Sequence, residues 1–350
     1  MKYFSILLIS ILFSCGPELT REDLLPDASG LHGEIILLME NDLYNGRIGE
    51  AVVAQLSQNA KGVYLRPEPM FSFIRMRPKD LDHLNQLKRN ILKIVVDFDS
   101  TYAETAVIEK RNYFAKNQLF VIVKDSDPDR LYEYVAKEFN YILNLFNDFE
   151  MEQLKREYVN NPNKNIKQSA EKNFGISICI PKEAELRVDS SDFMWIKRDR
   201  SKQVMGNMTS EPGSQTYWIQ QGILIWSHPY KDTSQLTVNG ALQVRDTVLK
   251  YHVPGKVKGS YMATEYDEYY CPKGKIFNYK GAYAVEIRGI WKHDGHPGAF
   301  GGGPFVQYTI HNETKGTVVT VCGYVYGPKY DKREYIREID AMLNTIEVLN

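Results

Sequence analysis

The chain has 350 residues, a natural length for two domains rather than for one simple core. Its composition, 43% hydrophobic and 25% charged, is that of a folded protein and excludes a globally disordered one. The formal net charge of −1 lacks the basic excess typical of nucleic-acid binding, so we expect no nucleic-acid partner.

Residues 1–15 have the pattern of a bacterial lipoprotein signal. Lys2 precedes an apolar run over 3–13 that is too short to span a bilayer. The run ends in "LFSC", which resembles a lipobox: an aliphatic residue, a small residue before the cleaved bond, and a thiol that can accept the lipid. We therefore expect a signal peptide at 1–14 and lipidation of Cys15, which anchors the mature chain to a membrane. The alternative is an ordinary cleaved signal peptide.

The polar, proline-bearing residues 15–30 predict a tether that holds the folded part away from the membrane. Strand and helix patterns then alternate over 31–160 and predict an N-terminal α/β domain. Compact apolar runs predict strands at 33–39, 70–78, 91–98 and 118–124. Apolar spacing predicts helices at 47–58 and 79–90 and a long helix from Asp127-Pro128 to Phe149.

Residues 159–173 are polar, contain a proline and have no apolar period, so we place a linker between domains at 161–173. Residues 174–350 form the predicted C-terminal domain. Strands are expected at 174–181, 193–198, 216–229, 260–266, 282–291, 304–310 and 317–328. In "FGISICIP" (174–181), alternating apolar residues predict one buried face.

Two helices are expected among the strands of this domain. One lies around 239–255, and the other closes the chain, with Asp331 and Glu334 forming a capping-box-like start. The domain is therefore predicted to be α+β, a mostly antiparallel sheet with packed helices, and the whole chain to be α+β or α/β in two layered domains. The element order is similar to the Mog1/PsbP-like sandwich, an analogy of fold alone.

Three cysteines remain after Cys15, an odd number that leaves at least one without an intramolecular partner. Cys179 and Cys322 lie in apolar strands, where they form a disulfide if the strands are neighbours or act as small buried apolar residues. No cysteine pair has the spacing of zinc ligands.

The stretch "RGIWKHDGHPGAFGGGPF" (288–305) contains His293, Asp294 and His296 within one Gly/Pro-rich turn. Metal ligands usually come from separate rigid elements, so we expect no metal here. The glycines lack the Gly-Lys-Ser/Thr sequence of a phosphate-binding loop, and a strand follows them rather than a helix. No cofactor is predicted.

The strand before this turn carries better candidates. Glu286 and Arg288 point to the same face, where they bind a ligand or form an ion pair. The candidate binding residues are Glu286, Arg288, Trp291, Tyr261, Glu265 and Phe305. No catalytic residue is assigned, because no strong catalytic motif is present.

Several phrases in fixed order, among them "LLPDASGLHGEIILLM", "VPGKVKGSYMATE" and "GYVYGPKYDKREYIREIDAML", resemble an uncharacterised lipoprotein family of the Bacteroidota, a domain-of-unknown-function family. The resemblance covers about Leu24 to Leu343. It implies an envelope lipoprotein without an assigned reaction. In that family Arg288, Gly289, Trp291 and residues 302–305 recur, whereas the histidines between them do not.

Our leading hypothesis is a lipid-anchored cell-envelope protein that binds another envelope component, a protein or a glycan. The alternative is an envelope hydrolase in which Glu286, Arg288, Tyr261 and Glu265 converge in one pocket.

Overall fold

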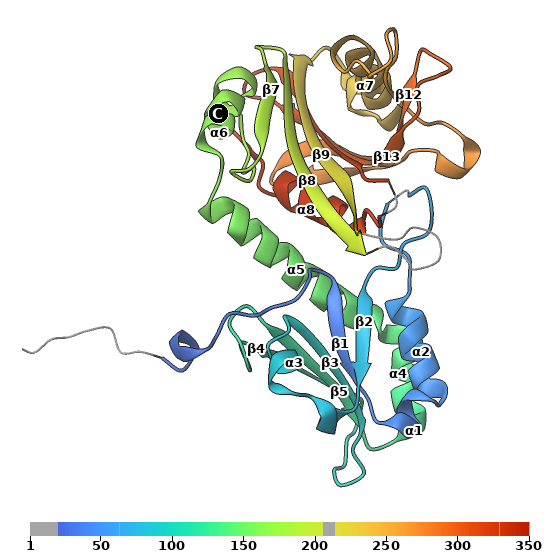
Figure 1. The fold of residues 1–350 in the computed structure, drawn as a ribbon. Helices are drawn as coiled ribbons and strands as arrows, with labels where there is room; N and C mark the ends of the chain where they lie inside the picture. The colour runs from blue at the N-terminus through green and yellow to red at the C-terminus, as the bar shows by residue number, and fades with distance from the viewer. Residues whose placement is uncertain (1–19, 63, 206–213, 329, 350) are drawn as a thin grey trace, which may run out of the picture.

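The computed structural model describes residues 20–62, 64–205, 214–328 and 330–349, arranged as two domains connected by one long helix (Figure 1). The predicted signal peptide at 1–14 and Cys15 lie outside the described residues. Within the described part, no helix is long and apolar enough to cross a membrane.

The end of the predicted tether is bound to the N-terminal domain. A short 3-10 helix, η1 (Glu22–Leu24), is followed by bridges from Asp27 to Lys116 and from Ser29 to Lys88. The backbone N–H of Ala28 donates to the carbonyl of Lys116 at 2.9 Å. The prediction of a tether that extends to residue 30 is therefore wrong at its end, because backbone hydrogen bonds fix residues 26–29 to the domain.

The N-terminal domain contains a five-stranded sheet in the order β2-β1-β3-β5-β4. Its strands are β1 (Glu34–Leu38), β2 (Ser72–Met76), β3 (Asn90–Val96), β4 (Ala106–Arg111) and β5 (Leu119–Asp125). The first four in this order are parallel, and β4, which the sequence analysis missed, is an antiparallel edge strand. Both β1 and β2 begin near the C-terminal domain and run away from it (Figure 1).

One face of this sheet is covered by helices. The helical segments of the whole domain are α1 (Asn41–Tyr44), α2 (Arg47–Leu56), η2 (Pro78–Asp80), α3 (His83–Gln86), α4 (Pro128–Glu138) and α5 (Asn140–Asn160), and Leu81, between η2 and α3, packs on the opposite face. Side chains from α2, α4 and α5 pack with β1, β3 and β5 in one core. The helix predicted over 79–90 is reduced to η2 and α3, and the helix predicted from Asp127 is divided into α4 and α5 at Phe139.

Helix α5 belongs to both domains, because its first half packs in the N-terminal core and Leu154 and Tyr158 pack in the C-terminal core. The linker predicted at 161–173 is wrong, because helix α6 (Lys164–Phe174) occupies it. Asn163 caps its start, and Ile166, Ala170 and Phe174 form a buried stripe four residues apart. Only three residues form this stripe, and the polar residues of the helix outnumber them, so the helical period was not recognised in the sequence.

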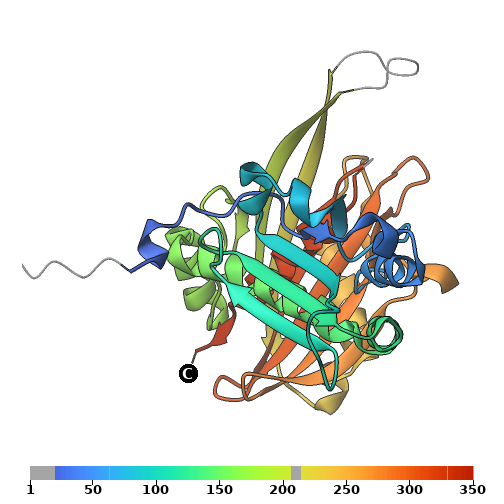
Figure 2. The ribbon, with the colours of Figure 1, turned by 90° about the horizontal axis from the view of Figure 1, so that it is seen from below.

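The C-terminal domain is built on an eight-stranded antiparallel sheet in the order β10-β12-β13-β14-β9-β8-β7, with β11 also paired to β12. Its strands are β7 (Glu185–Asp189), β8 (Phe193–Met205), β9 (Ser214–Pro229), β10 (Tyr261–Thr264), β11 (Lys273–Tyr279), β12 (Ala282–Asp294), β13 (Gly302–Asn312) and β14 (Thr317–Tyr326). The hairpin of β8 and β9 extends beyond the rest of the molecule (Figure 2). The predicted α+β class is confirmed, and β7 and β11 were not predicted.

Two helices cover opposite faces of this sheet. Helix α7 (Val238–His252), preceded by η3 (Thr233–Leu236), packs on one face with Val285, Ile287 and Trp291. Helix α8 (Arg333–Leu343) packs on the other face with Val306 and Tyr308. The remaining elements are η4 (Glu268–Tyr270), β6 (Ile176–Ser177) and β15 (Glu347–Val348).

The segment 174–181 differs from its prediction as a strand with one buried face. Only β6 is a strand there, paired with β15, and every residue of 174–181 is buried. Helix α6 and the last residues of the chain enclose it. Cys179 and Cys322 are buried, Cys271 is exposed, and all three are free.

Candidate functional site

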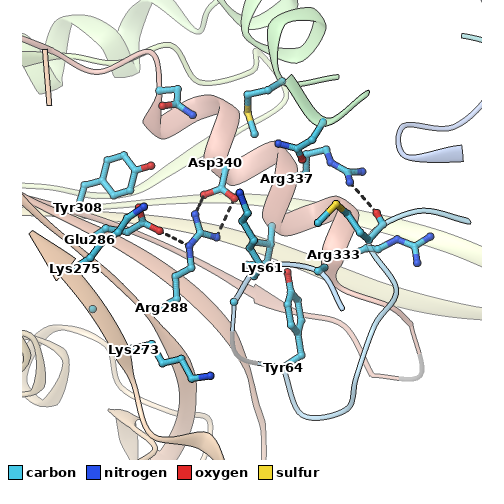
Figure 3. Close-up of a pocket in the computed structure, with 18 residues that line it drawn as sticks. Lys61, Tyr64, Lys273, Lys275, Glu286, Arg288, Tyr308, Arg333, Arg337 and Asp340 are labelled. Atoms are coloured by element: carbon cyan, nitrogen blue, oxygen red, sulfur yellow. Dashed lines mark hydrogen bonds and ion pairs between the residues drawn. The ribbon is translucent and has the colours of Figure 1, made fainter. Parts of the chain in front are cut away.

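A pocket of about 380 Å³ lies where the two domains meet (Figure 3). The N-terminal domain contributes residues 60–62, Tyr64, Met70 and part of α5. The C-terminal domain contributes β11, β12, β13 and α8. Pockets that bind small ligands often form at such domain interfaces.

Arg288 lies at the centre of this pocket (Figure 3). Its guanidinium donates two hydrogen bonds to the carboxylate of Asp340 on α8, at 2.7 and 3.0 Å, and a third to Glu286. The side chains of Glu286 and Arg288 share a face because strand residues two apart do so. Asp340 reaches them because α8 crosses this face. The paired hydrogen bonds from the guanidinium of Arg288 to Asp340 therefore connect strand β12 to helix α8.

Burial and charge act against each other in this cluster. Burial lowers the pKa of Arg288, but Asp340 and Glu286 outweigh it and raise that pKa above its ordinary value. Burial raises the pKa of Glu286, but Arg288 and Lys275 outweigh it and leave that pKa below its ordinary value. Glu286 and Arg288 are therefore both ionised at neutral pH.

Two tyrosines complete the centre of the pocket. Tyr64 comes from the N-terminal domain, and its hydroxyl donates to the carbonyl of Lys61 at 3.2 Å. Tyr308 comes from β13 and is held by edge-on contacts with Phe277 and Tyr279. Burial raises the pKa of both hydroxyls, so both remain neutral. Neutral phenols can donate hydrogen bonds to an anionic group.

The pocket has an excess of positive charge. Of the described residues that line it, six are basic and two are acidic. The basic residues are Lys61, Lys273, Lys275, Arg288, Arg333 and Arg337. Lys275 pairs with Glu286 at 3.1 Å, whereas the ammonium groups of Lys61 and Lys273 form no ion pair with any described residue.

Helix α8 joins the domains through its first turn. The Glu68 carboxylate accepts hydrogen bonds from the backbone N–H groups of Lys332 and Arg333, both at 2.7 Å. Arg333 and Arg337 donate to the carbonyl oxygens of Pro69 and Met70 at 2.9 and 3.0 Å. An acid from the other domain thus supplies the negative charge that a helix N-terminus favours.

The capping-box start predicted for α8 is therefore wrong. Lys332 occupies the N-cap position without a side-chain cap, Asp331 pairs with Arg66, and Glu334 pairs with Arg333 and Arg337. Glu68 takes the role of the local cap. It lies 264 residues before Lys332 in the sequence, so local spacing could not identify it.

The predicted convergence of Glu286, Arg288, Tyr261 and Glu265 is wrong. Tyr261 pairs with Asp294 at the far end of β12, and Glu265 accepts a hydrogen bond from Lys292 at 3.2 Å. Neither residue lines the pocket around Arg288. Strand β10 pairs with residues 291–294 at the end of β12, whereas Glu286 and Arg288 lie nearer its centre.

Trp291 and Phe305 lie on the opposite face of the sheet from Glu286 and Arg288. Both are buried in the core under α7. Trp291 donates from its indole N–H to the carbonyl of Val325 at 3.1 Å, and the Arg245 guanidinium lies 3.8 Å from the centre of the Phe305 ring. The alternation of the strand separates them from Arg288, a consequence that the sequence analysis left out.

The expectation that His293, Asp294 and His296 share one turn is wrong, because His293 and Asp294 are the last residues of β12 and only His296 lies in the turn that leads to β13. His293 packs edge-on against Trp291, and Asp294 and His296 are exposed. Among the described residues, no group of three His, Cys, Asp or Glu side chains is placed to hold a metal.

Sequence reasoning missed Lys61, Tyr64, Asp340 and the arginines of α8 as parts of the pocket. The charged start of α8 was visible in the sequence, together with the conflict between its cations and the helix dipole. That conflict is relieved by Glu68, which only the packing of the domains brings near.

Two family models match the chain. One, a domain of unknown function designated DUF8532, matches residues 28–159, and the other, DUF4837, matches residues 163–345. The chain matches no curated protein.

Among solved structures, the chain is similar to the Ran-binding protein Mog1p of Saccharomyces cerevisiae. The identity is 10%, the TM-score is 0.30, and the match covers 50% of this chain and 91% of Mog1p. A Mog1 point mutant matches equally, with 92% of its chain covered. The match to residues 163–345 identifies the chain as a member of the family of the domain of unknown function DUF4837.

Proposed function

We propose that this protein is a lipid-anchored envelope protein of Bacteroidota that binds an anionic envelope component in the pocket between its domains. The lipobox at Cys15 supports the anchor. The positively charged pocket supports the ligand class.

The single observation that carries the ligand class is the surplus of cations around Arg288. The carboxylates of Glu286 and Asp340 compensate the buried arginine, so the exposed Lys61 and Lys273 are left to attract an anion. Lys61 comes from one domain and Lys273 from the other. A carboxylate or phosphate group between them would contact both domains.

Binding of a small anion tests this proposal. We expect inorganic pyrophosphate and citrate to bind the mature protein at low ionic strength, measured by isothermal titration calorimetry. The double variant Lys61→Ala/Lys273→Ala should bind about tenfold more weakly, because two charged contacts are lost. Added salt should weaken binding to the wild type, since exposed charges are screened.

The matched control is Lys164→Ala/Lys182→Ala, which removes the same charge at two exposed positions outside the pocket. It should bind like the wild type. If both double variants lose affinity equally, the effect comes from net charge alone, and the pocket is not the site.

The anchor is tested separately by growing cells with a labelled fatty acid. Wild-type protein should carry the label and remain with the membrane fraction, and Cys15→Ala should lose the label. Equal labelling and equal membrane retention of the two proteins would exclude the anchor.

We do not extend the proposal to hydrolysis. That alternative requires Tyr261 and Glu265 beside Arg288, and they lie at the far end of β12.

A further inference from the structure

A second pocket, of about 710 Å³, lies on the face of the C-terminal sheet that α7 covers. It lies beyond the C-terminal end of α7. Its floor is formed by β8, β9, β12 and β14. Its walls are the loop after α7, residues 253–260, and the turn residues 298–300. Its volume lies within the range of about 300–1,000 Å³ that is typical of small-molecule sites.

Six aromatic side chains line this pocket, apart from His293. They are Trp195, Trp218, Trp291, Phe300, Tyr324 and Tyr326. Trp218, Phe300 and Tyr326 remain 65%, 85% and 37% exposed. Single exposed aromatic residues are common, but three around one pocket form an apolar patch. Covering this patch with a ligand would remove apolar surface from water, which is favourable.

The inner rings are held in fixed positions. The indole N–H of Trp195 donates to the hydroxyl of Tyr324 at 3.0 Å, and that hydroxyl donates to Gln220 at 3.4 Å. Trp291 packs edge-on against Tyr324 with ring centres 5.7 Å apart. Gly222 leaves the space for this arrangement, because a Cβ there would lie 2.1 Å from the Tyr324 ring. A surface that is ordered before binding loses little entropy when a ligand arrives.

Polar groups alternate with these rings. Lys197, Asp199, Gln220 and Lys256 line the same pocket. The ammonium group of Lys197 lies 4.3 Å from the centre of the Trp195 ring. The pocket therefore offers aromatic faces together with amide, carboxylate and ammonium groups.

This mixture selects among ligand classes. Gln220 already donates to Asp199 and accepts from Tyr324, and an acyl chain would cover both groups without using the second N–H of Gln220 or the second carboxylate oxygen of Asp199. A proline-rich peptide uses aromatic grooves but has few N–H donors for the carboxylate. A pyranose ring has an apolar C–H face that lies flat on an aromatic ring and hydroxyl groups at its rim that donate and accept hydrogen bonds.

We propose that this pocket binds a short oligosaccharide, with a sugar ring stacked on Trp218 and its hydroxyl groups bonded to Gln220 and Asp199. Both residues lie beside Trp218 on the paired strands β8 and β9, where Gln220 pairs with Asp199. The site is separate from the charged pocket, because it lies on the opposite face of the sheet. The two proposals therefore stand or fall independently.

Titration with soluble trisaccharides tests the proposal. The probes are chitotriose, cellotriose, maltotriose and mannotriose, followed by tryptophan fluorescence and calorimetry with the mature protein. At least one probe should bind, and Trp218→Ala/Phe300→Ala should weaken it by about tenfold or more, because stacking area is lost.

The matched control is Phe98→Ala/Tyr269→Ala, which removes two rings that are 76% and 86% exposed outside the pocket. It should bind the same probe like the wild type, and circular dichroism should show that both variants are folded. A third variant, Gln220→Ala, should weaken sugar binding without removing an aromatic ring.

Absence of binding by all four probes would overturn the proposal, as would equal binding by the wild type and Trp218→Ala/Phe300→Ala. If decaproline or oleate binds instead, and that binding is lost in the same variant, the pocket serves a peptide or an acyl chain and the sugar assignment is wrong.

Discussion

The two faces of the C-terminal sheet contain pockets of opposite character, and strand β12 contributes side chains to both. On β12, Glu286 and Arg288 face α8, and Trp291 faces α7. The α8 face meets the other domain. It contains the paired charges of Glu286, Arg288 and Asp340, with Lys61 and Lys273, which form no ion pair with any described residue. The α7 face opens to solvent beyond its helix and contains aromatic rings. Residues a few positions apart in sequence thus line two pockets of different chemistry.

Of the substitutions that test this difference between the two faces, Arg288→Ala should have the largest effect on the free energy of unfolding. Arg288→Ala leaves Glu286 and Asp340 without their shared partner, so the free energy of unfolding should fall by about 3–5 kcal/mol in urea denaturation. Arg187→Ala is the control, since its exposed pair with Glu185 should contribute less than about 1 kcal/mol. A loss in Arg288→Ala as small as that in Arg187→Ala would show that the buried cluster does not hold α8 on the sheet.

A smaller effect is expected at Glu68, which caps α8 from the other domain. Glu68→Ala should cost about 1–3 kcal/mol, because two N–H groups lose their acceptor. Glu68→Gln retains an oxygen acceptor and should cost less. Hydrogen exchange at the amides of Lys332 and Arg333 should accelerate in the alanine variant, and unchanged exchange would contradict the cap.

Acid should distinguish the charged face from the aromatic one. Because Arg288 and Lys275 outweigh burial and hold the pKa of Glu286 below 4.5, its contribution to stability is present above that value. The contribution is lost as the pH falls through the lowered pKa. Unfolding between pH 7 and 3 should therefore depend less steeply on pH in Glu286→Gln than in wild type, whereas Trp218→Ala should keep the wild-type slope. Identical slopes in all three proteins would contradict the assignment.

The smallest effect on stability is expected at the aromatic pocket. Trp218→Ala removes a mostly exposed ring, so the free energy of unfolding should change by no more than about 0.5 kcal/mol. Thermal unfolding measures this change. Burial of a large apolar side chain stabilises a protein by at least about 1.5 kcal/mol. A loss above that value would mean that the ring is packed and unavailable to a ligand.

Strong local patterns predicted the fold well. Apolar runs identified β1, β3 and β5, and Asp127-Pro128 identified the start of α4. Strands β4, β7 and β11 were missed because they are edge strands with few buried residues. Helix α6 was missed because its polar residues outnumber its buried ones.

The site was predicted only where it depends on one strand. The shared face of Glu286 and Arg288 follows from alternation. The partner Asp340 and the lysines of the pocket come from distant segments, and nothing in their local sequence indicates the contact. The grouping of Trp291 with Arg288 failed because the odd and even residues of a strand point in opposite directions.

The contact between the domains has a consequence for sequence variation. On the N-terminal side, Arg333 and Arg337 bind the carbonyl oxygens of Pro69 and Met70 rather than their side chains. Every residue type supplies a carbonyl oxygen, so substitutions at positions 69 and 70 keep these two acceptors, whereas substitution of either arginine removes a donor. The Met70 side chain is constrained separately, because it packs against the N-terminal core. Mutational sensitivity at this interface should therefore be one-sided, concentrated in the helix and in Glu68. On the facing loop, a change of side chain at Pro69 leaves the bonds of the two arginines in place.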